Sequence, residues 1–258
     1  MNYHIKGVVS MLQKERLDQI LKIITTHKYV TVKFLMDELH YSTATINRDL
    51  NILAEQKLIK RHYGGAELAS DHSVPLRFRH HKMRAAKSKL GRAAAELVSD
   101  GDTIFIDGTT TTQCMAQFLT EKKDITVISN NMALIAYLSE YGINSICLGG
   151  SVVEAPSMLF SIDTIETAAN FKADKHFFTS GGVSPDGKIW GGDIYAMLRK
   201  VMSENSALSY YLVDHAKYEE PHGKRTWCSL SEVSGVICDF DFPEETKSKF
   251  IKTEFIVV

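Results

Sequence analysis

The sequence has few cysteines and prolines and lacks any long apolar run. Its four cysteines stand singly and form no Cys-x-x-Cys pair, so we expect reduced thiols rather than a disulfide framework. No stretch approaches the roughly 20 consecutive apolar residues that a membrane-spanning helix needs. The first residues do not follow the pattern of a signal peptide. We therefore expect no contact with a membrane and a location in the cytoplasm.

Metal and cofactor sites are not expected either. His62, the pair His80–His81 and the dispersed cysteines do not make a ligand set for a metal ion. The remaining composition, 44% apolar and 24% charged over 258 residues, is ordinary for a globular protein of one large or two modest domains.

The charge is unevenly distributed along the chain. Residues 1–92 contain 17 Lys and Arg against 8 Asp and Glu, a balance of +9, whereas the remainder holds 13 against 23, a balance of −10. This split favours a basic N-terminal unit that contacts a polyanion, joined to an acidic body that does not. The alternative is a basic, solvated linker, because residues 77–92 supply much of the excess.

Residues 15–40 show two amphipathic helical patterns with a break at His27–Tyr29 and with Thr31 as an N-cap. The apolar positions are Leu17, Ile20, Leu21 and Ile24 in the first and Val32, Leu35, Met36 and Leu39 in the second. A third helix is predicted after Ser42, its expected cap, with Ile46, Leu50 and Leu53 buried. Its opposite face carries Ala44, Asn47, Arg48 and Asn51. Arg and Asn side chains pair with base edges in a major groove, which indicates a helix-turn-helix.

The segment after the third helix predicts a β-wing. "LIKRHYGGAEL" combines a strand-like run with Lys60, Arg61 and His62 and a Gly-Gly turn, so these basic side chains can contact phosphate. Two alternatives stay open at this point: an ordinary hairpin that closes a small helical domain, and a third helix whose polar face is merely solvated.

Residues 11–67 closely resemble the N-terminal domain of the DeoR family of bacterial transcription regulators, through Glu15–Arg16, "STATINRDLNIL" and "KRHYGGA". The resemblance implies a winged helix-turn-helix over residues 11–68 and contacts with double-stranded operator DNA. The implied DNA contacts are Ser42, Thr43, Ala44, Thr45, Asn47, Arg48, Asn51, Lys60, Arg61 and His62. Family members begin close to the position of Met11, so we expect residues 1–10 to be a disordered or misannotated extension.

The rest of the chain predicts a linker and an α/β body. Residues 69–84 contain Pro75 and mixed polarity, as interdomain linkers do. Beyond them, helices near 85–99, 111–120 and 131–140 alternate with strands at 103–107, 125–129 and 144–148. Later strands are expected at 175–179, 208–213, 234–238 and 254–257. Such alternation indicates a mostly parallel sheet that is covered on both faces and binds its ligand at the carboxyl ends of the strands.

Residues 107–112 are the most informative of the loops that follow these strands. Asp107 and Gly108 precede four threonines, Thr109 to Thr112, at the predicted start of a helix. Backbone N–H groups and the helix dipole suit a phosphate there, and hydroxyl groups add further donors. A single threonine would suffice as a helix cap, which is the alternative, so the row of four favours an anion site.

Further loops offer polar groups at the same edge of the sheet. They contain Asn130 in "SNN", Gly149 and Gly150 in "LGGS", and Asp214 with Lys217 in "LVDHAKY". A carboxylate suits sugar hydroxyls and a lysine suits phosphate, although a surface ion pair of Asp214 and Lys217 is an alternative. Together these loops fit an anionic ligand that carries several hydroxyls.

The body resembles the effector domain of the DeoR family, which is similar to the ribose-5-phosphate isomerase type of fold and senses phosphorylated sugars. The resemblance is carried by "FIDGTTTT", "SNN", "LGG" and "LVDHAK", and it extends to the basic positions Arg79 and Lys87. The sequence departs from the family pattern at Thr109, Ser161, Thr179, Tyr195 and Arg199–Lys200. The implied effector-sensing domain covers residues 85–258.

Three functions are compatible with these features. The first is a DNA-binding regulator of sugar metabolism genes, by family default a repressor, that is modulated by a phosphorylated sugar and acts as a homodimer or homotetramer on paired half-sites. The second is a sugar-phosphate isomerase, in which Asp107 or Asp214 would serve as the base. The third is a regulator with a degenerate ligand site that responds to a protein partner. We favour the first, with no catalytic residues and no cofactor.

Overall fold

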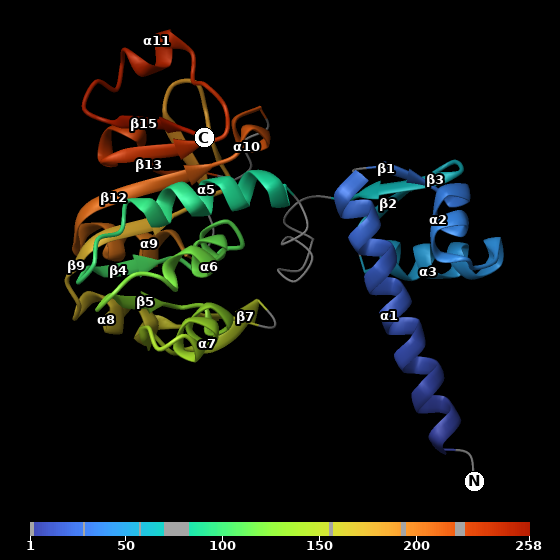
Figure 1. Ribbon diagram of the computed structural model, residues 1–258. Helices are drawn as coiled ribbons and strands as arrows, with labels where there is room; N and C mark the ends of the chain where they lie inside the picture. The colour runs from blue at the N-terminus through green and yellow to red at the C-terminus, as the bar shows by residue number, and fades with distance from the viewer. Residues whose placement is uncertain are drawn as a thin grey trace. The chain divides into compact units, whose positions relative to one another are not determined.

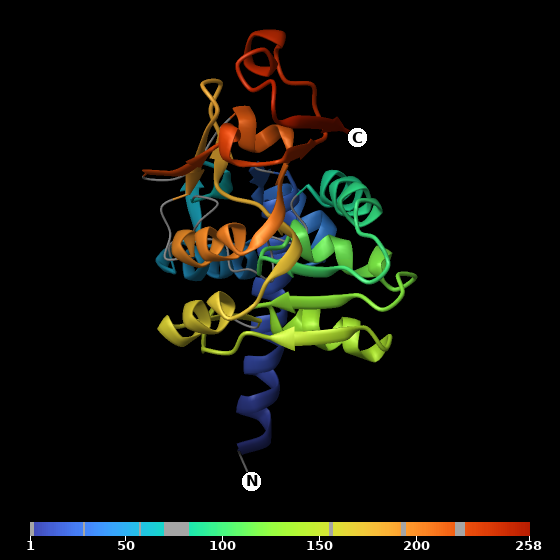
Figure 2. The ribbon, with the colours of Figure 1, turned by 90° about the vertical axis from the view of Figure 1, so that its left-hand side faces the viewer.

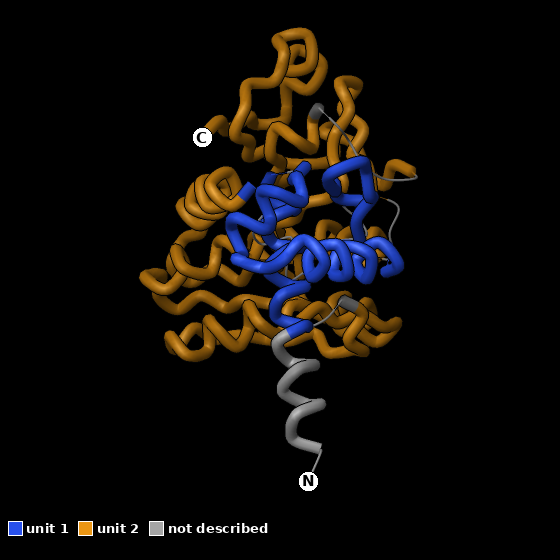
Figure 3. The backbone as a smooth tube through the Cα atoms, turned by 90° about the vertical axis from the view of Figure 1, so that its right-hand side faces the viewer, with its two compact units in different colours: residues 1–83 blue, residues 84–258 orange. Residues whose placement is uncertain are grey.

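The computed structural model describes residues 3–27, 29–56, 58–69, 83–154, 157–191, 195–219 and 225–258, with the backbone alone for residues 3–12, 154 and 219. The chain divides into two compact units (Figures 1 and 3). Unit 1 comprises Met1–Met83 and unit 2 comprises Arg84–Val258.

Unit 1 is a bundle of three helices closed by a small antiparallel sheet. The helices are α1 (Tyr3–His27), α2 (Val32–Leu39) and α3 (Thr43–Glu55). The strands β1 (Tyr29–Thr31), β2 (Ile59–His62) and β3 (Gly65–Leu68) pair in the order β1-β3-β2. Its core consists of Ile20, Leu21, Ile24, Val30, Leu35, Ile46, Leu50, Leu53, Ile59 and Ala66.

The helical patterns and caps of unit 1 are confirmed. Thr31 caps α2 by accepting a hydrogen bond from the N–H of Phe34 at 3.0 Å, and Ser42 caps α3 by accepting from Thr45 at 3.3 Å. The break at His27–Tyr29 leads directly into β1, which the sequence did not predict. Three residues are too few to show the two-residue period of a strand, and β1 is held by its pairing with β3.

Helix α1 begins at Tyr3, inside the segment that we expect to be a disordered or misannotated extension, and that expectation stays a prediction. No proline interrupts the sequence between Tyr3 and His27. Extending an existing helix adds one hydrogen bond per residue without the cost of nucleation, so helix formation continues from the packed part of α1 toward the N-terminus.

Unit 2 is built on a seven-stranded sheet with the order β15-β14-β12-β9-β4-β5-β6, in which every neighbouring pair is parallel. The predicted mostly parallel sheet is thereby confirmed. The strands are β4 (Thr103–Ile106), β5 (Thr126–Ser129), β6 (Asn144–Cys147), β9 (Ala173–Phe178), β12 (Ser206–Val213), β14 (Gly235–Cys238) and β15 (Glu254–Val257).

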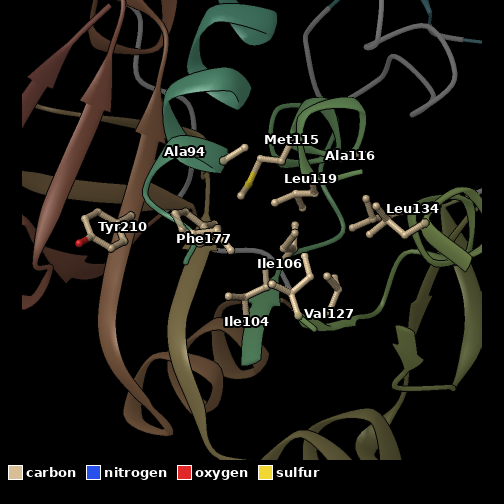
Figure 4. Packing of buried hydrophobic residues seen from close by; sticks show 14 of the residues in the cluster. Ala94, Ile104, Ile106, Met115, Ala116, Leu119, Val127, Leu134, Phe177 and Tyr210 are labelled. Atoms are coloured by element: carbon tan, nitrogen blue, oxygen red, sulfur yellow. The ribbon is translucent and has the colours of Figure 1, made fainter. Parts of the chain in front are cut away.

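Helices cover both faces of this sheet, as Figure 2 shows with green helices on one side and yellow and orange helices on the other. One face packs on α5 (Arg84–Glu96), α6 (Ala116–Leu119) and α7 (Met132–Glu140), and the other on α8 (Ile162–Ala169) and α9 (Ala196–Glu204). Successive residues of a strand point to opposite faces. Ile104 and Ile106 accordingly enter the first core (Figure 4), whereas Phe105 enters the second.

The helix predicted over 111–120 is shorter and less regular than expected. It consists of a 3-10 segment, η2 (Thr112–Met115), followed by the single turn of α6. The threonine hydroxyls bond to nearby backbone and side-chain groups, which competes with regular helix formation.

Further short elements complete unit 2. They are the hairpin β7 (Ser151–Glu154) and β8 (Met158–Phe160), the antiparallel sheet of β10 (Gly182–Val183), β11 (Lys188–Gly191) and β13 (Arg225–Ser229), and the segments α10 (His215–Glu219), η3 (Leu230–Glu232) and α11 (Glu244–Lys247). Among the described residues, none of the helices combines the length and apolar character that a membrane crossing requires.

Candidate effector site and candidate nucleic-acid interface

The threonine row begins at the carboxyl end of β4, where Asp107 is almost fully buried. Thr109 and Thr112 donate their hydroxyls to Asp107 Oδ1 at 2.9 and 2.7 Å. The N–H of Thr179 and Nε of Arg199 donate to Asp107 Oδ2 at 3.2 and 3.1 Å. Both carboxylate oxygens are therefore engaged by the protein, and this network fixes the shape of the loop.

Thr110 and Thr111, in the middle of the row, meet two lysines from other parts of unit 2. Lys87 of α5 donates from Nζ to Thr110 Oγ1 at 3.0 Å. Lys217 of α10 lies 3.4 Å from Thr111 Oγ1 and donates to Thr179 Oγ1 at 2.7 Å. Two ammonium groups and neighbouring hydroxyls thus converge on one loop, which is the chemistry that an anion with several acceptor oxygens requires.

The charges around this loop favour an anion. Among the described residues that bond around this loop, Lys87, Lys217 and Arg199 are positively charged, and Asp107 and Asp214 are negatively charged. Lys87 is only 5% exposed. Burying a charged ammonium group is costly, so a buried lysine that bonds to the threonine row is a candidate for a binding role.

The other predicted ligand residues lie progressively farther along the sheet edge. Asn130, after β5, donates to the carbonyl of Leu159 at 2.8 Å and so holds β8 in place. Its buried Oδ1 finds no hydrogen-bond partner among the described residues. A Cβ at Gly108 would approach that oxygen to 2.8 Å, so the loop needs glycine there.

Gly149 and Gly150, after β6, support helix α8. Thr164 donates its hydroxyl to the carbonyl of Gly149 at 2.9 Å. Both glycines have positive φ, 75° and 113°, a region that favours residues without a Cβ. Arg79 lies outside the described residues, so its predicted role stays a prediction.

Arg199 and Thr179 were not among the predicted ligand residues, although both belong to the site. Arg199 lies on the buried face of α9 with Leu198 and Met202. A charged residue on an apolar helix face is a signal that the sequence carried, because buried charges need a partner. Thr179 directly follows β9, the strand between β4 and β12, so the strand order places its loop beside the threonine row.

His176 lies in β9, within the core on the α9 side of the sheet. Burial, with the nearby charge of Arg199, lowers the pKa of His176 to about 3. Its Nδ1 is 2.9 Å from the hydroxyl of Ser203, and its ring stacks on Phe178. This histidine is therefore neutral at pH 7. The described residues contain no group of three or more His, Cys, Asp or Glu side chains arranged to hold a metal ion.

In unit 1, helix α3 is anchored by a buried ion pair between Arg16 of α1 and Asp49 of α3. Arg16 Nη2 donates to Asp49 Oδ1 at 3.0 Å, and the guanidinium also lies over the ring of Tyr41. Bonding to Asp49 raises the pKa of Arg16 further, although burial opposes this effect. The pair fixes the orientation of α3 against α1.

The polar face of α3 is only partly as predicted. Ala44, Arg48 and Asn51 are exposed, whereas Asn47 is half-buried. Ser42 and Thr45 bond to each other in the cap, at 3.0 Å between their hydroxyl oxygens. Thr43 bonds to the sulfur of Met36 at 3.1 Å.

The three basic residues of β2 are separated by the alternation of the strand. Lys60 and His62 are exposed, and Arg61 is half-buried. Arg61 donates from Nη1 to Asn51 Oδ1 and from Nη2 to Asn47 Oδ1, both at 2.7 Å. His62 Nε2 lies 3.1 Å from the carboxylate of Glu67. Arg61 therefore faces helix α3 and not the outer face of the wing.

Two models of known protein families match most of this chain. Residues 16–72 match the DeoR-like helix-turn-helix domain, and residues 82–240 match the DeoR C terminal sensor domain. The chain belongs to the DeoR family. Both units of this DeoR family member are thereby accounted for, and the predicted family resemblance is confirmed for each.

Curated relatives of this DeoR family member carry the names of repressors. The glycerol-3-phosphate regulon repressor of Escherichia coli is 28% identical over 229 residues, which cover 88% of this chain and 89% of the relative. The HTH-type transcriptional repressor GlcR of Bacillus subtilis is 33% identical and covers 89% of each chain. The lactose phosphotransferase system repressor of Staphylococcus aureus is 26% identical and covers 96% of this chain and all of the relative.

Solved structures resemble the DeoR family member more distantly. Ribose 5-phosphate isomerase A from Methanocaldococcus jannaschii has a TM-score of 0.39 at 18% identity and covers 53% of this chain and 55% of that chain. The translation initiation factor eIF-2B of Pyrococcus horikoshii has a TM-score of 0.44 at 17% identity and covers 88% of each. The fold is defined by the strand order given above and not by these scores.

Proposed function

We propose that this chain is a sequence-specific DNA-binding transcription regulator of sugar metabolism genes, a repressor, whose activity a phosphorylated sugar modulates. In this proposal residues 11–68 bind operator DNA, residues 69–84 link the domains and residues 85–258 sense the effector. The protein acts in the cytoplasm as a homodimer or homotetramer, because one recognition helix spans few base pairs and affinity requires paired half-sites.

One observation carries the effector part of the proposal. Lys87 and Lys217, from different helices, bond to the neighbouring hydroxyls of Thr110 and Thr111. A phosphate that replaces these hydroxyl contacts would receive two charge-assisted hydrogen bonds and the donors of the threonine row. The names of the relatives, which include a glycerol-3-phosphate regulon repressor, support a phosphorylated small molecule as the effector class.

The geometry of Asp107 favours regulation over isomerisation. A general base needs a carboxylate oxygen within reach of the proton that it removes. Four donors, namely Thr109, Thr112, Thr179 and Arg199, occupy both oxygens of Asp107. The other candidate, Asp214, is almost fully buried and lies 3.8 Å from the ammonium group of Lys217. We therefore propose that the chain is not an enzyme.

The experiment uses the full chain and two binding measurements. Its preferred DNA is first enriched from a pool of duplexes with a randomised central segment, and a shuffled duplex of the same composition serves as the nonspecific control. Glycerol 3-phosphate, fructose 1-phosphate, glucose 6-phosphate, ribose 5-phosphate and inorganic phosphate are then tested by thermal shift, each sugar phosphate beside its unphosphorylated parent. At least one phosphorylated sugar is expected to raise the melting temperature and change affinity for the enriched duplex.

A double variant locates the effector site. Thr110→Val with Thr111→Val removes the two hydroxyls beside the lysines and is expected to abolish the effector response while operator binding stays intact. Lys200→Met, at an exposed position of α9, is the matched control and should respond like wild type. A persistent response in the double variant would show that the phosphate binds elsewhere.

Two further outcomes would favour the alternative functions. Turnover of ribose 5-phosphate would favour an enzyme. If no compound changes the melting temperature, a protein partner is favoured as the signal.

A further inference from the structure

Arg61 is held against the recognition helix by a fork of hydrogen bonds. Its two terminal nitrogens donate to the side-chain oxygens of Asn47 and Asn51, at 2.7 Å each, and Nη1 also lies 3.3 Å from the backbone oxygen of Asn47. The two asparagines are four residues apart and so lie one turn apart on the same face of α3. A planar guanidinium can bridge two such oxygens, whereas a lysine ammonium is a single point of charge.

The third nitrogen of the guanidinium, Nε, shows which bonds determine the orientation of Arg61. Arg61 Nε is buried and has no hydrogen-bond partner among the described residues. Leaving a buried donor unsatisfied is unfavourable, so the orientation is set by the bonds to the asparagine oxygens. Lys60 and His62 lie on the other face of the strand and are exposed, where a duplex can reach them.

These bonds also fix which end of each asparagine side chain faces outward. Asn47 is engaged at both ends, because its Nδ2 donates to the carbonyl of Thr43 at 3.0 Å. Asn51 is exposed and accepts from Arg61 through Oδ1, so the end of its amide that bonds to the wing is the oxygen and not Nδ2. The Nδ2–H₂ group of Asn51 is then the end available as a donor, which matches acceptors such as guanine O6 and N7 or thymine O4.

We propose that Arg61 is a positioning residue for base recognition and not a phosphate contact. It orients the Asn51 amide as a donor toward the major groove and withdraws Asn47 from base contact. The inference rests on the proposed DNA-binding function, and it assigns the phosphate contacts of the wing to Lys60 and His62. It makes Asn51, together with Arg48, responsible for sequence preference, with an acceptor-bearing base opposite Asn51.

The test compares Arg61→Lys with Lys60→Gln on the enriched and the shuffled duplex over a series of salt concentrations. Arg61→Lys keeps the charge but loses the fork, so the ratio of the two affinities is expected to fall about tenfold with an unchanged salt dependence. Lys60→Gln removes a phosphate contact and should weaken both duplexes equally, with a salt slope smaller by about one unit. Circular dichroism of each variant checks that unit 1 remains folded.

Base selection gives a second readout that a loss of fold cannot mimic. Repeating the enrichment with Arg61→Lys should relax the preference at one position of each half-site and retain the others. Asn51→Ala should relax the same position, and adding Arg61→Lys to it should change nothing further, because the two residues act as one unit. The inference is overturned if Arg61→Lys selects and binds like wild type, or if Arg61→Gln weakens both duplexes equally and lowers the salt slope. If wild type enriches no sequence, the DNA-binding proposal itself fails.

Discussion

Arg199 and Asp107 form a buried ion pair in unit 2, with 3.1 Å between Nε and Oδ2 and side chains that are 4% and 3% exposed. The pair joins helix α9, on one face of the sheet, to the loop after β4 that carries the threonine row. The shape of the candidate effector site therefore depends on a charge contributed from outside the loop.

Replacing Arg199 with Met should destabilise unit 2 by about 3–5 kcal/mol, because Asp107 would keep a buried charge without its partner. Urea unfolding followed by tryptophan fluorescence reports on this unit selectively, since Trp190 and Trp227 are the only tryptophans of the chain. Lys200→Met is the control. Its partner Glu204 is 3.8 Å away at the surface, so the loss should stay below about 1 kcal/mol. Equal effects in the two variants would contradict the role of the buried pair.

Thr112→Val should lower the stability of unit 2 by about 1–3 kcal/mol, because Asp107 loses a buried hydrogen-bond donor while the side-chain volume is retained. The Thr112 hydroxyl lies 2.7 Å from Asp107 Oδ1 and 2.8 Å from its backbone oxygen. Thr120→Val is the comparison, since the hydroxyl of Thr120 makes an exposed contact with the carbonyl of Gln117. If Thr112→Val unfolds at the same urea concentration as Thr120→Val, the hydrogen bond from Thr112 to Asp107 does not stabilise unit 2.

Arg48→Ala should weaken binding to the enriched duplex by about 1–3 kcal/mol and leave binding to the shuffled duplex nearly unchanged. Arg48 is exposed in the N-terminal half of α3, where a guanidinium can reach guanine O6 and N7. Fluorescence anisotropy with both duplexes at one salt concentration measures the difference. An equal loss on the two duplexes would identify Arg48 as a phosphate contact.

The stability of unit 2 should fall as the pH drops below about 6.5, in part because of His176. Its pKa is lowered to about 3 in the folded state, so between these values the unfolded chain binds a proton that the folded chain does not. The contribution of His176 to the free energy of unfolding is fully present above the pKa of the unfolded state. As the pH falls from there toward the folded-state pKa, this contribution decreases by about 1.4 kcal/mol per pH unit. The measurement is urea unfolding, followed by tryptophan fluorescence, at several values between pH 4 and pH 7.

A matched pair of variants isolates this contribution. His176→Gln removes the titrating group, so its stability should decline less steeply with falling pH than that of wild type. Ser203→Ala removes the hydroxyl beside the imidazole but keeps the histidine, so its stability should retain the wild-type slope. Identical slopes for wild type and His176→Gln would assign the acid sensitivity to other groups.

Much of the fold could be predicted because local patterns determine it. Helical periodicity identified the buried positions of α1, α2 and α3, and the caps at Thr31 and Ser42 follow from side-chain chemistry within four residues. The longer strands of unit 2 were also predictable, since buried parallel strands read as short apolar runs between turns. Strand β1 and the β7–β8 hairpin were not, because such short segments depend on the strands with which they pair.

The sequence by itself determined that a basic N-terminal unit precedes an acidic α/β body, and that hydroxyl, amide and lysine groups follow its strands. Only the tertiary structure decided how these groups are used, because strand order and side-chain partners depend on contacts between distant segments. The order β12-β9-β4 brings Lys217, Thr179 and the threonine row together. Gly149 and Gly150 follow β6, which is two strands away from β4 at the edge of the sheet. The same packing turns Arg61 toward Asn47 and Asn51 and leaves Lys60 outside, although all of them read as polar residues in sequence.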